Sequence, residues 1–167
     1  MLSSLIVRDA IGESSSATTN SEHDNWIIAQ AFALLEHRLY ASGPTLSAPE
    51  AARDYLRLHL MQEPSEVFAA IFLTTQHQVI ACEVLFRGTV DQTKVHPRVI
   101  VQRALVHNAA ALIVAHQHPS GNTSPSDADR AITARLRTAL DLIEVRLLDH
   151  LVIGKGDPYS FAYHGLI

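Results

Sequence analysis

A short apolar segment that ends in two histidines constrains this chain more than any other feature. Residues 109–115 are apolar and rich in branched side chains, and His-Gln-His-Pro-Ser-Gly follows at residues 116–121. Such a run, bounded by Pro, Ser and Gly, predicts a buried β-strand. Because residues i and i+2 of a strand share a face, we expect His116 and His118 to point together and Gln117 to point away.

A second local pattern brings a carboxylate towards these histidines. Pro125 and Ser126 precede an amphipathic helix expected over residues 126–141, and Asp129 lies in its first turn. Two imidazoles and a carboxylate suit Zn²⁺, and zinc with three protein ligands keeps a fourth position for water. Zinc lowers the pKa of that water towards neutrality. The sequence therefore predicts a zinc hydrolase site.

Simpler interpretations exist for each pattern taken alone. Ser126 and Asp129 also fit a capping box, with Ser126 as the N-cap and an acid in the first turn. The two histidines at the strand end could equally face solvent. The capping and ligand roles are compatible, because an N-cap at Ser126 would fix the helix that presents Asp129.

The spacing resembles a known family. His-x-His, seven residues, Ser, two residues and Asp is the zinc signature of the JAMM (MPN+) metalloproteases, and His116, His118, Ser126 and Asp129 fit it without a gap. The chain is most similar to the RadC-like branch, with which it shares the following segments: Glu83 to Thr89, His96-Pro97-Arg98, His116 to Gly121, Pro125-Ser126 and Asp149-His150. The resemblance covers roughly residues 45–167 and implies a cytidine-deaminase-like fold.

The resemblance also implies two catalytic residues. In JAMM enzymes a glutamate on an earlier strand takes a proton from the catalytic water, and Glu83 holds the matching position within an expected strand over residues 79–88. A buried acid is costly unless it is paired or serves a site, so the alternative is an edge strand on which Glu83 faces water. Ser126 matches a serine thought to hold the water or the oxyanion, and its N-cap role is the alternative.

A third histidine accompanies this pattern. His150 follows Asp149 beside an apolar run, and its ring is expected to pair with Asp149 or a backbone carbonyl. A direct ligand role is disfavoured. A role in holding a ligand fits better, because a ligand imidazole usually donates its other N–H to a neighbour. The sequence leaves open which residue is that neighbour.

Composition limits the partners and the compartment. The net charge is −4, the pI is near 6.2, and Lys and Arg form no run, so the footprint of a nucleic-acid partner is weak. One cysteine, Cys82, suits a reducing cytoplasm and is expected to be a core residue more than a nucleophile. No apolar stretch reaches the roughly 18 residues of a membrane span. The N-terminus also lacks a basic leader, so we expect a cytoplasmic protein.

The order of patterns predicts an α/β fold, a mixed sheet flanked by helices, preceded by a short helical segment. We expect an N-terminal polar lead-in and helix over residues 1–44 and a RadC-like JAMM domain over 45–167. Residues 8–24 are polar and should form a lead-in without a core. The expected helices span residues 26–40, 47–61, 97–109 and 126–141, and the expected strands span 67–74, 79–88, 110–116, 143–153 and 159–162.

Three functions are compatible with these observations. The first is a zinc-dependent hydrolase of peptide or isopeptide bonds, with a peptide or protein substrate. The second is a DNA-repair-associated accessory protein whose metal site is structural or vestigial. The third is an interaction module that metal binding stabilises. Apolar surface on the first two helices would allow a homo-oligomer.

Overall fold

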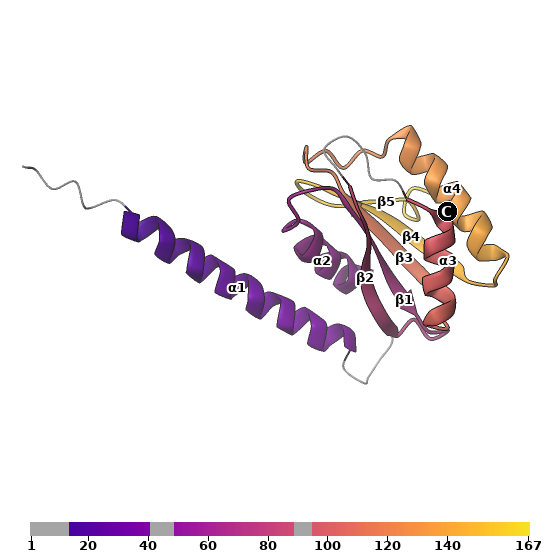
Figure 1. Cartoon of the computed structure of the whole chain (residues 1–167), viewed down its shortest axis with the longest axis horizontal. Coiled ribbons are helices and arrows are strands. Elements are labelled where there is room, and N and C mark those ends of the chain that lie inside the picture. The colour runs from indigo at the N-terminus through magenta and orange to yellow at the C-terminus, as the bar shows by residue number, and fades with distance from the viewer. Residues whose placement is uncertain (1–13, 41–48, 89–94) are drawn as a thin grey trace, which may run out of the picture.

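The computed structural model describes residues 14–40, 49–88 and 95–167, which form a sheet with helices on both faces (Figure 1). In chain order the elements are α1 (Ser14–Tyr40), α2 (Pro49–Leu60), β1 (Val67–Leu73), β2 (Val79–Arg87), α3 (Pro97–Val106), β3 (Ala111–Gln117), α4 (Asp127–Asp141), β4 (Arg146–Ile153) and β5 (Tyr159–Ser160). The predicted α/β class, a mixed sheet flanked by helices, is confirmed.

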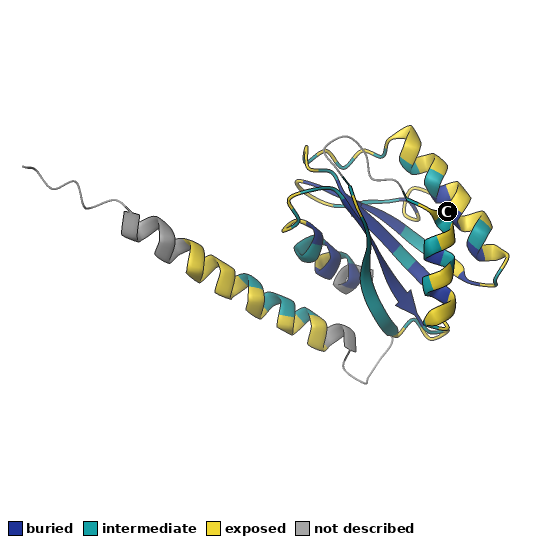
Figure 2. Cartoon of the chain, viewed as in Figure 1, coloured by how far each residue is buried: buried dark blue, intermediate teal, exposed yellow. Residues whose placement is uncertain are grey.

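The sheet has the strand order β2-β1-β3-β4-β5. β1 pairs antiparallel with both β2 and β3, whereas β3 and β4 are parallel and α4 makes the crossover between them. All seven residues of β1 are buried (Figure 2). Its sequence, VFAAIFL, has no polar alternation because helices cover the sheet on both sides. The strand that pairs with β3 is thus fixed at the centre of the fold.

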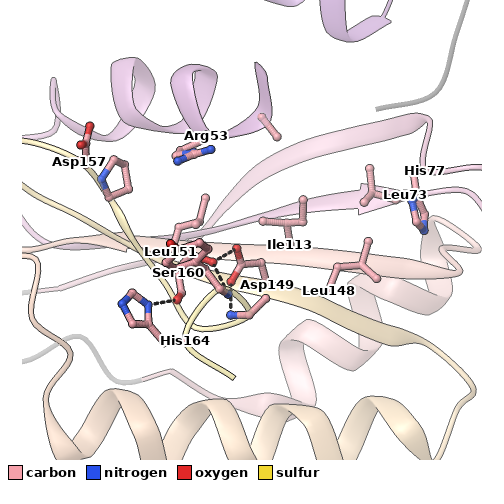
Figure 3. A pocket seen from close by; sticks show the side chains of 14 residues that line it. Arg53, Leu73, His77, Ile113, Leu148, Asp149, Leu151, Asp157, Ser160 and His164 are labelled. Carbon is pink, nitrogen blue, oxygen red and sulfur yellow. Dashed lines mark hydrogen bonds between the residues drawn. The ribbon is translucent and has the colours of Figure 1, made fainter. Parts of the chain in front are cut away.

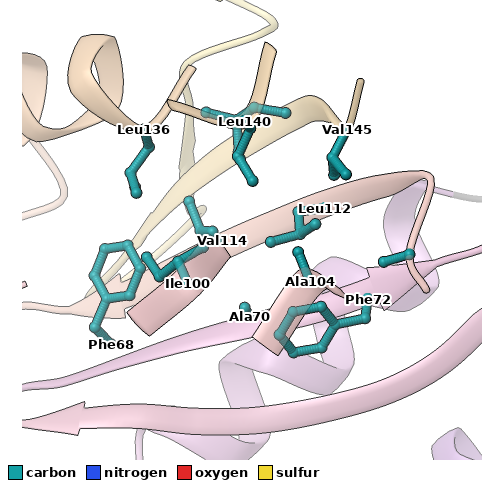
Figure 4. Close-up of a cluster of buried hydrophobic side chains, with 12 residues drawn as sticks. Phe68, Ala70, Phe72, Ile100, Ala104, Leu112, Val114, Leu136, Leu140 and Val145 are labelled. Atoms are coloured by element: carbon teal, nitrogen blue, oxygen red, sulfur yellow. The ribbon is translucent and has the colours of Figure 1, made fainter. Parts of the chain in front are cut away.

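Two hydrophobic clusters lie on opposite faces of the sheet. On one face Phe72 and Leu112 of the sheet pack with Ile100 of α3 and with Leu136 and Leu140 of α4 (Figure 4). The alternate side chains of the same strands pack with α2 on the other face. Fully burying one such Leu, Ile or Phe contributes roughly 1.5–3 kcal/mol. The first cluster holds α4 against β3, which brings the predicted ligands near one another.

Helix α1 runs outward from the sheet and its helices (Figure 1). Its Phe32 ring meets the edges of Tyr55 and His59 of α2, at centroid separations of 6.2 and 5.7 Å. The helix begins at Ser14, whereas the sequence predicted that it starts at residue 26. The residues before 14, the expected boundary at 44/45 and the expected start of the second helix at residue 47 lie outside the described residues.

The end of α3 and the start of β4 differ from the prediction because a residue with a positive φ lies beside each of them. Helix α3 ends at Val106 instead of residue 109, and Asn108 has a φ of 48°. Strand β4 begins at Arg146 instead of residue 143, and Glu144 has a φ of 57°. A residue in the left-handed region interrupts both helix and strand. The other bounds agree with the prediction to within two residues, apart from the start of α1.

Within the described ranges, no helix is both long enough and apolar enough to cross a membrane.

Candidate metal centre

Three predicted ligands meet where β3 ends and α4 begins. The Nε2 atoms of His116 and His118 are 3.0 Å apart. The two carboxylate oxygens of Asp129 lie 3.1 Å from His116 Nε2 and 3.6 Å from His118 Nε2, respectively. One donor atom from each residue lies within 4.8 Å of the other two, so this group could hold a metal ion. The strand period does place both imidazoles on one face.

The separations fit a small tetrahedral ion. Zinc–nitrogen and zinc–oxygen bonds of about 2.0–2.1 Å at tetrahedral angles put neighbouring donor atoms about 3.3 Å apart. The separations from His116 Nε2 to His118 Nε2 and to Asp129 Oδ1, 3.0 and 3.1 Å, are close to that value. Calcium, in contrast, takes six to eight oxygen ligands at longer distances. A donor set of two nitrogens and one carboxylate therefore favours zinc or a similar transition metal.

A tight turn directs the end of β3. The Gly121 N–H donates to the His118 carbonyl at 2.8 Å, which closes a turn with Pro119 in its second position. Gly121 has a φ of 82°, a left-handed conformation that glycine adopts without a Cβ penalty. Beyond the strands, the His118 N–H donates to Ile153 O and the Lys155 N–H donates to Gly121 O. These bonds hold the turn against the end of β4.

The capping box at the start of α4 is confirmed. The Asp129 N–H donates to Ser126 Oγ at 3.2 Å, and the Ser126 N–H donates to Asp129 Oδ2 at 2.7 Å. The Ser126 hydroxyl also donates to Asp129 Oδ2 at 2.6 Å. The capping box is compatible with a ligand role for Asp129, because the cap orients the carboxylate whose other oxygen faces His116.

Asp129 and His118 each shift the pKa of the other so that both favour their charged forms. Burial works to raise the pKa of Asp129, but hydrogen bonds from His116 and His118 outweigh it, and the pKa is well below its usual range. The hydrogen bond to Asp129 in turn raises the pKa of His118, against the opposing effect of burial. The carboxylate thus favours a positive charge at the cluster. A bound cation would take the place of the proton, so metal and proton compete there.

The outer nitrogens of both histidines have protein partners. His118 Nδ1 lies 2.8 Å from the carbonyl oxygen of Asn122, so it carries the proton and donates. His116 Nδ1 lies 2.9 Å from Nε2 of His150. The neighbour that the sequence left open is thus His150 for one ligand and a backbone carbonyl for the other. Asp149 contacts the backbone N–H of His150 at 2.7 Å, whereas the expected pairing was with the ring.

Glu83 is not brought to this cluster. It lies on the edge strand β2, and its register partners are Ala70 on β1 and, one strand further, Val114 on β3. Two strand spacings amount to about 10 Å, and Val114 is itself two residues before His116. The reason is topological, because β1 inserts between β2 and β3. A role in proton transfer at the cluster was predicted for Glu83 from the order of strands along the chain, which does not show this insertion.

The carboxylate of Glu83 has partners on α3 instead. Arg103 donates to both of its oxygens, with Nε to Oε2 at 2.7 Å, and His107 Nε2 lies 2.8 Å from Oε1. The hydrogen bond from Arg103 holds the pKa of Glu83 below its ordinary value. The expected alternative, a glutamate that simply faces water on an edge strand, is therefore wrong: the strand is at the edge, but the acid is paired. The role of Glu83 as the general base stays a prediction.

Glu66 is the acid that faces the cluster. The register pairs Phe68 with His116, and continuing it by two residues sets Glu66 opposite His118. Glu66 shares a face with Phe68, whose ring stacks on His116 at a centroid separation of 6.2 Å. The negative charge of Glu66 adds to the effect of Asp129 in raising the pKa of His118. In the sequence, Glu66 is marked only as an acid directly before a buried strand, and its place at the cluster follows only once the pairing of β1 with β3 is known.

Gln117 points away from the cluster as predicted, and it has a partner there. Its side-chain oxygen accepts from the Val67 N–H at 2.8 Å, and its amide nitrogen donates to the Ser65 carbonyl at 2.5 Å. Gln117 is 5% exposed, so both bonds are shielded from water. The residue between the two histidines therefore fixes the backbone on both sides of Glu66.

A separate cavity lies on the α2 face of the sheet. It has a volume of about 670 Å³, with Ile113, Leu148 and Leu151 on its floor and Arg53 and His164 at its sides (Figure 3). His116, His118 and Asp129 are not among its lining residues. Asp149 and Asp157 are the carboxylates that line this cavity, and Ser160 Oγ donates to Asp149 at 2.6 Å. The cavity is thus distinct from the three-residue cluster.

Comparison with known proteins identifies the family. The model of the RadC-like JAB domain matches residues 46–166. This chain belongs to the RadC-like JAB domain family. The resemblance stated from the motifs is thereby confirmed, and the mixed sheet flanked by helices fits a JAB domain.

Several bacterial relatives of this RadC-like chain are known as UPF0758 proteins. One from Halorhodospira halophila is 58% identical over 125 residues, covering 75% of this chain and 56% of the relative. One from Azotobacter vinelandii is 54% identical over 122 residues (73% and 54%), and one from Xanthomonas euvesicatoria is 50% identical over 141 residues (83% and 63%). The chain spans little more than half the length of these relatives.

Proposed function

We propose that this RadC-like chain hydrolyses amide bonds of the peptide or isopeptide type, with a zinc ion held by His116, His118 and Asp129. The observation that carries the proposal is that one donor atom from each of these three residues lies within 4.8 Å of the other two. When bound, zinc would polarise the scissile carbonyl and make hydroxide available at neutral pH. Three protein ligands leave a fourth position, which is typical of catalytic zinc sites.

Glu66 is the best-supported proton carrier. Its carboxylate belongs to the face of β1 that carries Phe68 and lies towards His118, whose pKa its charge helps to raise. A carboxylate beside the attacking water can accept its proton and return it to the leaving amine. Glu83 is the competing assignment, but its oxygens already accept from Arg103 and His107. Hydrogen bonds from cations stabilise its ionised form and make it a weaker base.

The contacts of Ser126 support a role in positioning Asp129. A second role, stabilising the oxyanion of the substrate, needs a test by substitution. Its hydroxyl donates to Asp129 Oδ2 at 2.6 Å and so orients the ligand carboxylate. To stabilise an oxyanion, the same hydroxyl would have to turn from Asp129 towards the substrate oxygen. Ser126→Ala separates the two roles, because loss of orientation lowers metal affinity whereas loss of oxyanion stabilisation lowers kcat alone.

Metal content is the first test. Purified wild-type protein, reconstituted with zinc, should hold about one ion per chain by mass spectrometry, and His118→Ala and Asp129→Ala should hold none. His164→Ala is a matched control, because His164 is an exposed histidine outside the cluster. A wild-type chain that holds no zinc would overturn the proposal.

Hydrolysis is tested separately with a peptide library digested in ¹⁸O-labelled water. Amide hydrolysis adds one ¹⁸O atom to each new carboxylate, so cleavage is read without knowing the substrate. We expect Glu66→Gln to abolish the label and Glu83→Gln to retain most of it. The reverse pattern would return the base to Glu83. Zinc binding without cleavage would favour the accessory-protein or metal-stabilised hypotheses, and the former predicts strongly salt-dependent DNA binding.

A further inference from the structure

A buried hydrogen-bond chain runs from one ligand of the cluster to another. His150 Nε2 lies 2.9 Å from His116 Nδ1, and His150 Nδ1 lies 2.6 Å from Thr133 Oγ1. The Thr133 hydroxyl lies 2.5 Å from the backbone carbonyl of Asp129. His150 is 0% exposed and Thr133 is 2% exposed. Four residues from β3, β4 and α4 are thus joined away from solvent.

Only one direction of donation satisfies this chain when His150 is neutral. A carbonyl oxygen can only accept, so the single hydroxyl proton of Thr133 goes to Asp129. Towards His150, Thr133 must then accept, which puts the proton of His150 on Nδ1. The unprotonated Nε2 of His150 must accept from His116, and the proton of His116 therefore lies on Nδ1. When His116 is neutral as well, its lone pair is therefore on Nε2, which faces His118 and Asp129.

The surroundings of His150 keep its ring neutral. Phe161 stacks on it at a centroid separation of 4.8 Å, and the edge of Phe68 meets it at 5.5 Å. Both ring nitrogens have partners, an imidazole and a hydroxyl, and neither partner is a carboxylate. A charged imidazolium in such a position would be expensive. The direction of donation deduced for the neutral ring therefore applies.

We propose that Thr133 and His150 are positioning residues that select the tautomer of His116 with its free lone pair towards the metal position. This inference rests on the proposed metal site. It goes beyond that site, because neither residue touches the metal position and Thr133 belongs to no ligand motif. The placement of Thr133 supports it: an apolar side chain would suit this buried position on α4, and a buried hydroxyl is costly without partners.

Replacing Thr133 by valine should change the tautomer of His116. In Thr133→Val, the Nδ1–H of His150 loses its acceptor, and the ring gains by moving its proton to Nε2. That proton then points at His116 Nδ1, which must give up its own proton and carry it on Nε2. The proton of His116 would then occupy the position that the metal needs. A partner of this kind typically contributes about 10–100-fold to metal affinity.

The test compares three variants of helix α4 in the full chain, with zinc alone as the probe. Thr133→Val removes the hydroxyl at constant shape, and Thr133→Ser restores it. Thr138→Val is the matched control, because Thr138 also donates to a carbonyl four residues earlier but is exposed. Zinc affinity is measured by competition with a chromophoric chelator. The tautomer of His116 is read from its ¹⁵N chemical shifts in the zinc-free protein.

We expect Thr133→Val to weaken zinc binding by about 10–100-fold and to shift His116 towards the Nε2–H form. Thr133→Ser and Thr138→Val should keep both wild-type values. Wild-type affinity together with an unchanged His116 tautomer in Thr133→Val would overturn the inference, as would weakened binding that serine does not rescue.

A second substitution guards against a purely structural effect. His150→Phe keeps the ring stacked on Phe161 and removes both hydrogen bonds, so it should also weaken zinc binding and shift the His116 tautomer. His164→Phe is its control.

The outcomes that contradict the two proposals are different. Zinc binding without amide hydrolysis would contradict the proposed function and leave the positioning role of Thr133 and His150 intact. The ¹⁵N shifts of His116 test the tautomer even if the wild type binds no zinc.

Discussion

The carbonyl oxygen of Gly121 lies 2.6 Å from the point where a Cβ atom on Gly154 would stand. Real Cβ atoms essentially never come this close, and the neighbour is backbone, which cannot swing aside. We expect Gly154→Ala to lower the free energy of unfolding by about 1–3 kcal/mol, the usual cost of overpacking. Urea denaturation of the two proteins measures the difference.

Gly156→Ala is the comparison for that substitution. Gly156 has a φ of 92° but no heavy atom within 4 Å of its would-be Cβ, so only backbone strain should count, about 1 kcal/mol. Gly154→Ala should also weaken zinc binding, because the turn next to His118 must move, whereas Gly156→Ala should not. Equal effects of the two substitutions on zinc binding would contradict the role assigned to this contact.

Asp129→Asn should separate the ligand role of this residue from its capping role. The amide oxygen can still accept from the Ser126 N–H, so the helix start survives, but the lost charge interaction with His116 and His118 should lower the free energy of unfolding. Zinc binding should fall steeply, because the neutral side chain no longer offsets the charge of the cation. Thermal denaturation and zinc competition on the same sample check both parts.

Cys82 should react slowly with thiol reagents in the native protein. Burial raises its pKa to about 12, and the nearby negative charge of Glu83 adds to this effect, so almost no thiolate is present at pH 8. Alkylation by iodoacetamide should be complete in urea within a time that leaves the native thiol largely unmodified. Equal labelling rates would show that this strand position is open to solvent. The expectation of a core residue, not a nucleophile, is tested by the same experiment.

The ion-paired carboxylate of Glu83 should make a small contribution to stability that disappears in acid. Its pKa is lower in the folded chain than the ordinary value of 4.5, chiefly because Arg103 donates to it. The stabilisation is therefore fully present above about pH 4.5 and is lost as the pH falls through the folded pKa. Glu83→Gln should be slightly less stable than wild type at pH 7, since partly exposed ion pairs contribute little.

Urea denaturation of wild type and Glu83→Gln at pH 7, 5, 4 and 3 measures this difference. The gap between the two proteins should stay constant from pH 7 to 5 and close below it. A gap that widens in acid would mean that the carboxylate is destabilised, not stabilised, by its surroundings.

The ligand cluster was predictable because each part of it is local. His116 and His118 share a face through the two-residue period of a strand, and Ser126 and Asp129 are joined by a capping box within one helical turn. A few intervening residues and a turn built on Pro119 close the distance between the two elements. Short-range stereochemistry therefore sufficed to predict which side chains would meet.

The proposed proton carrier and the proposed positioning residues could be chosen only from the tertiary structure. Glu83 and Glu66 both precede the histidines along the chain, and only the insertion of β1 between β2 and β3 sets Glu66 at the cluster and Glu83 at Arg103. Thr133 and His150 meet because the parallel pairing of β3 with β4 brings two distant segments under α4. Strand order and helix crossover depend on the packing of the whole sheet, which no local spacing encodes.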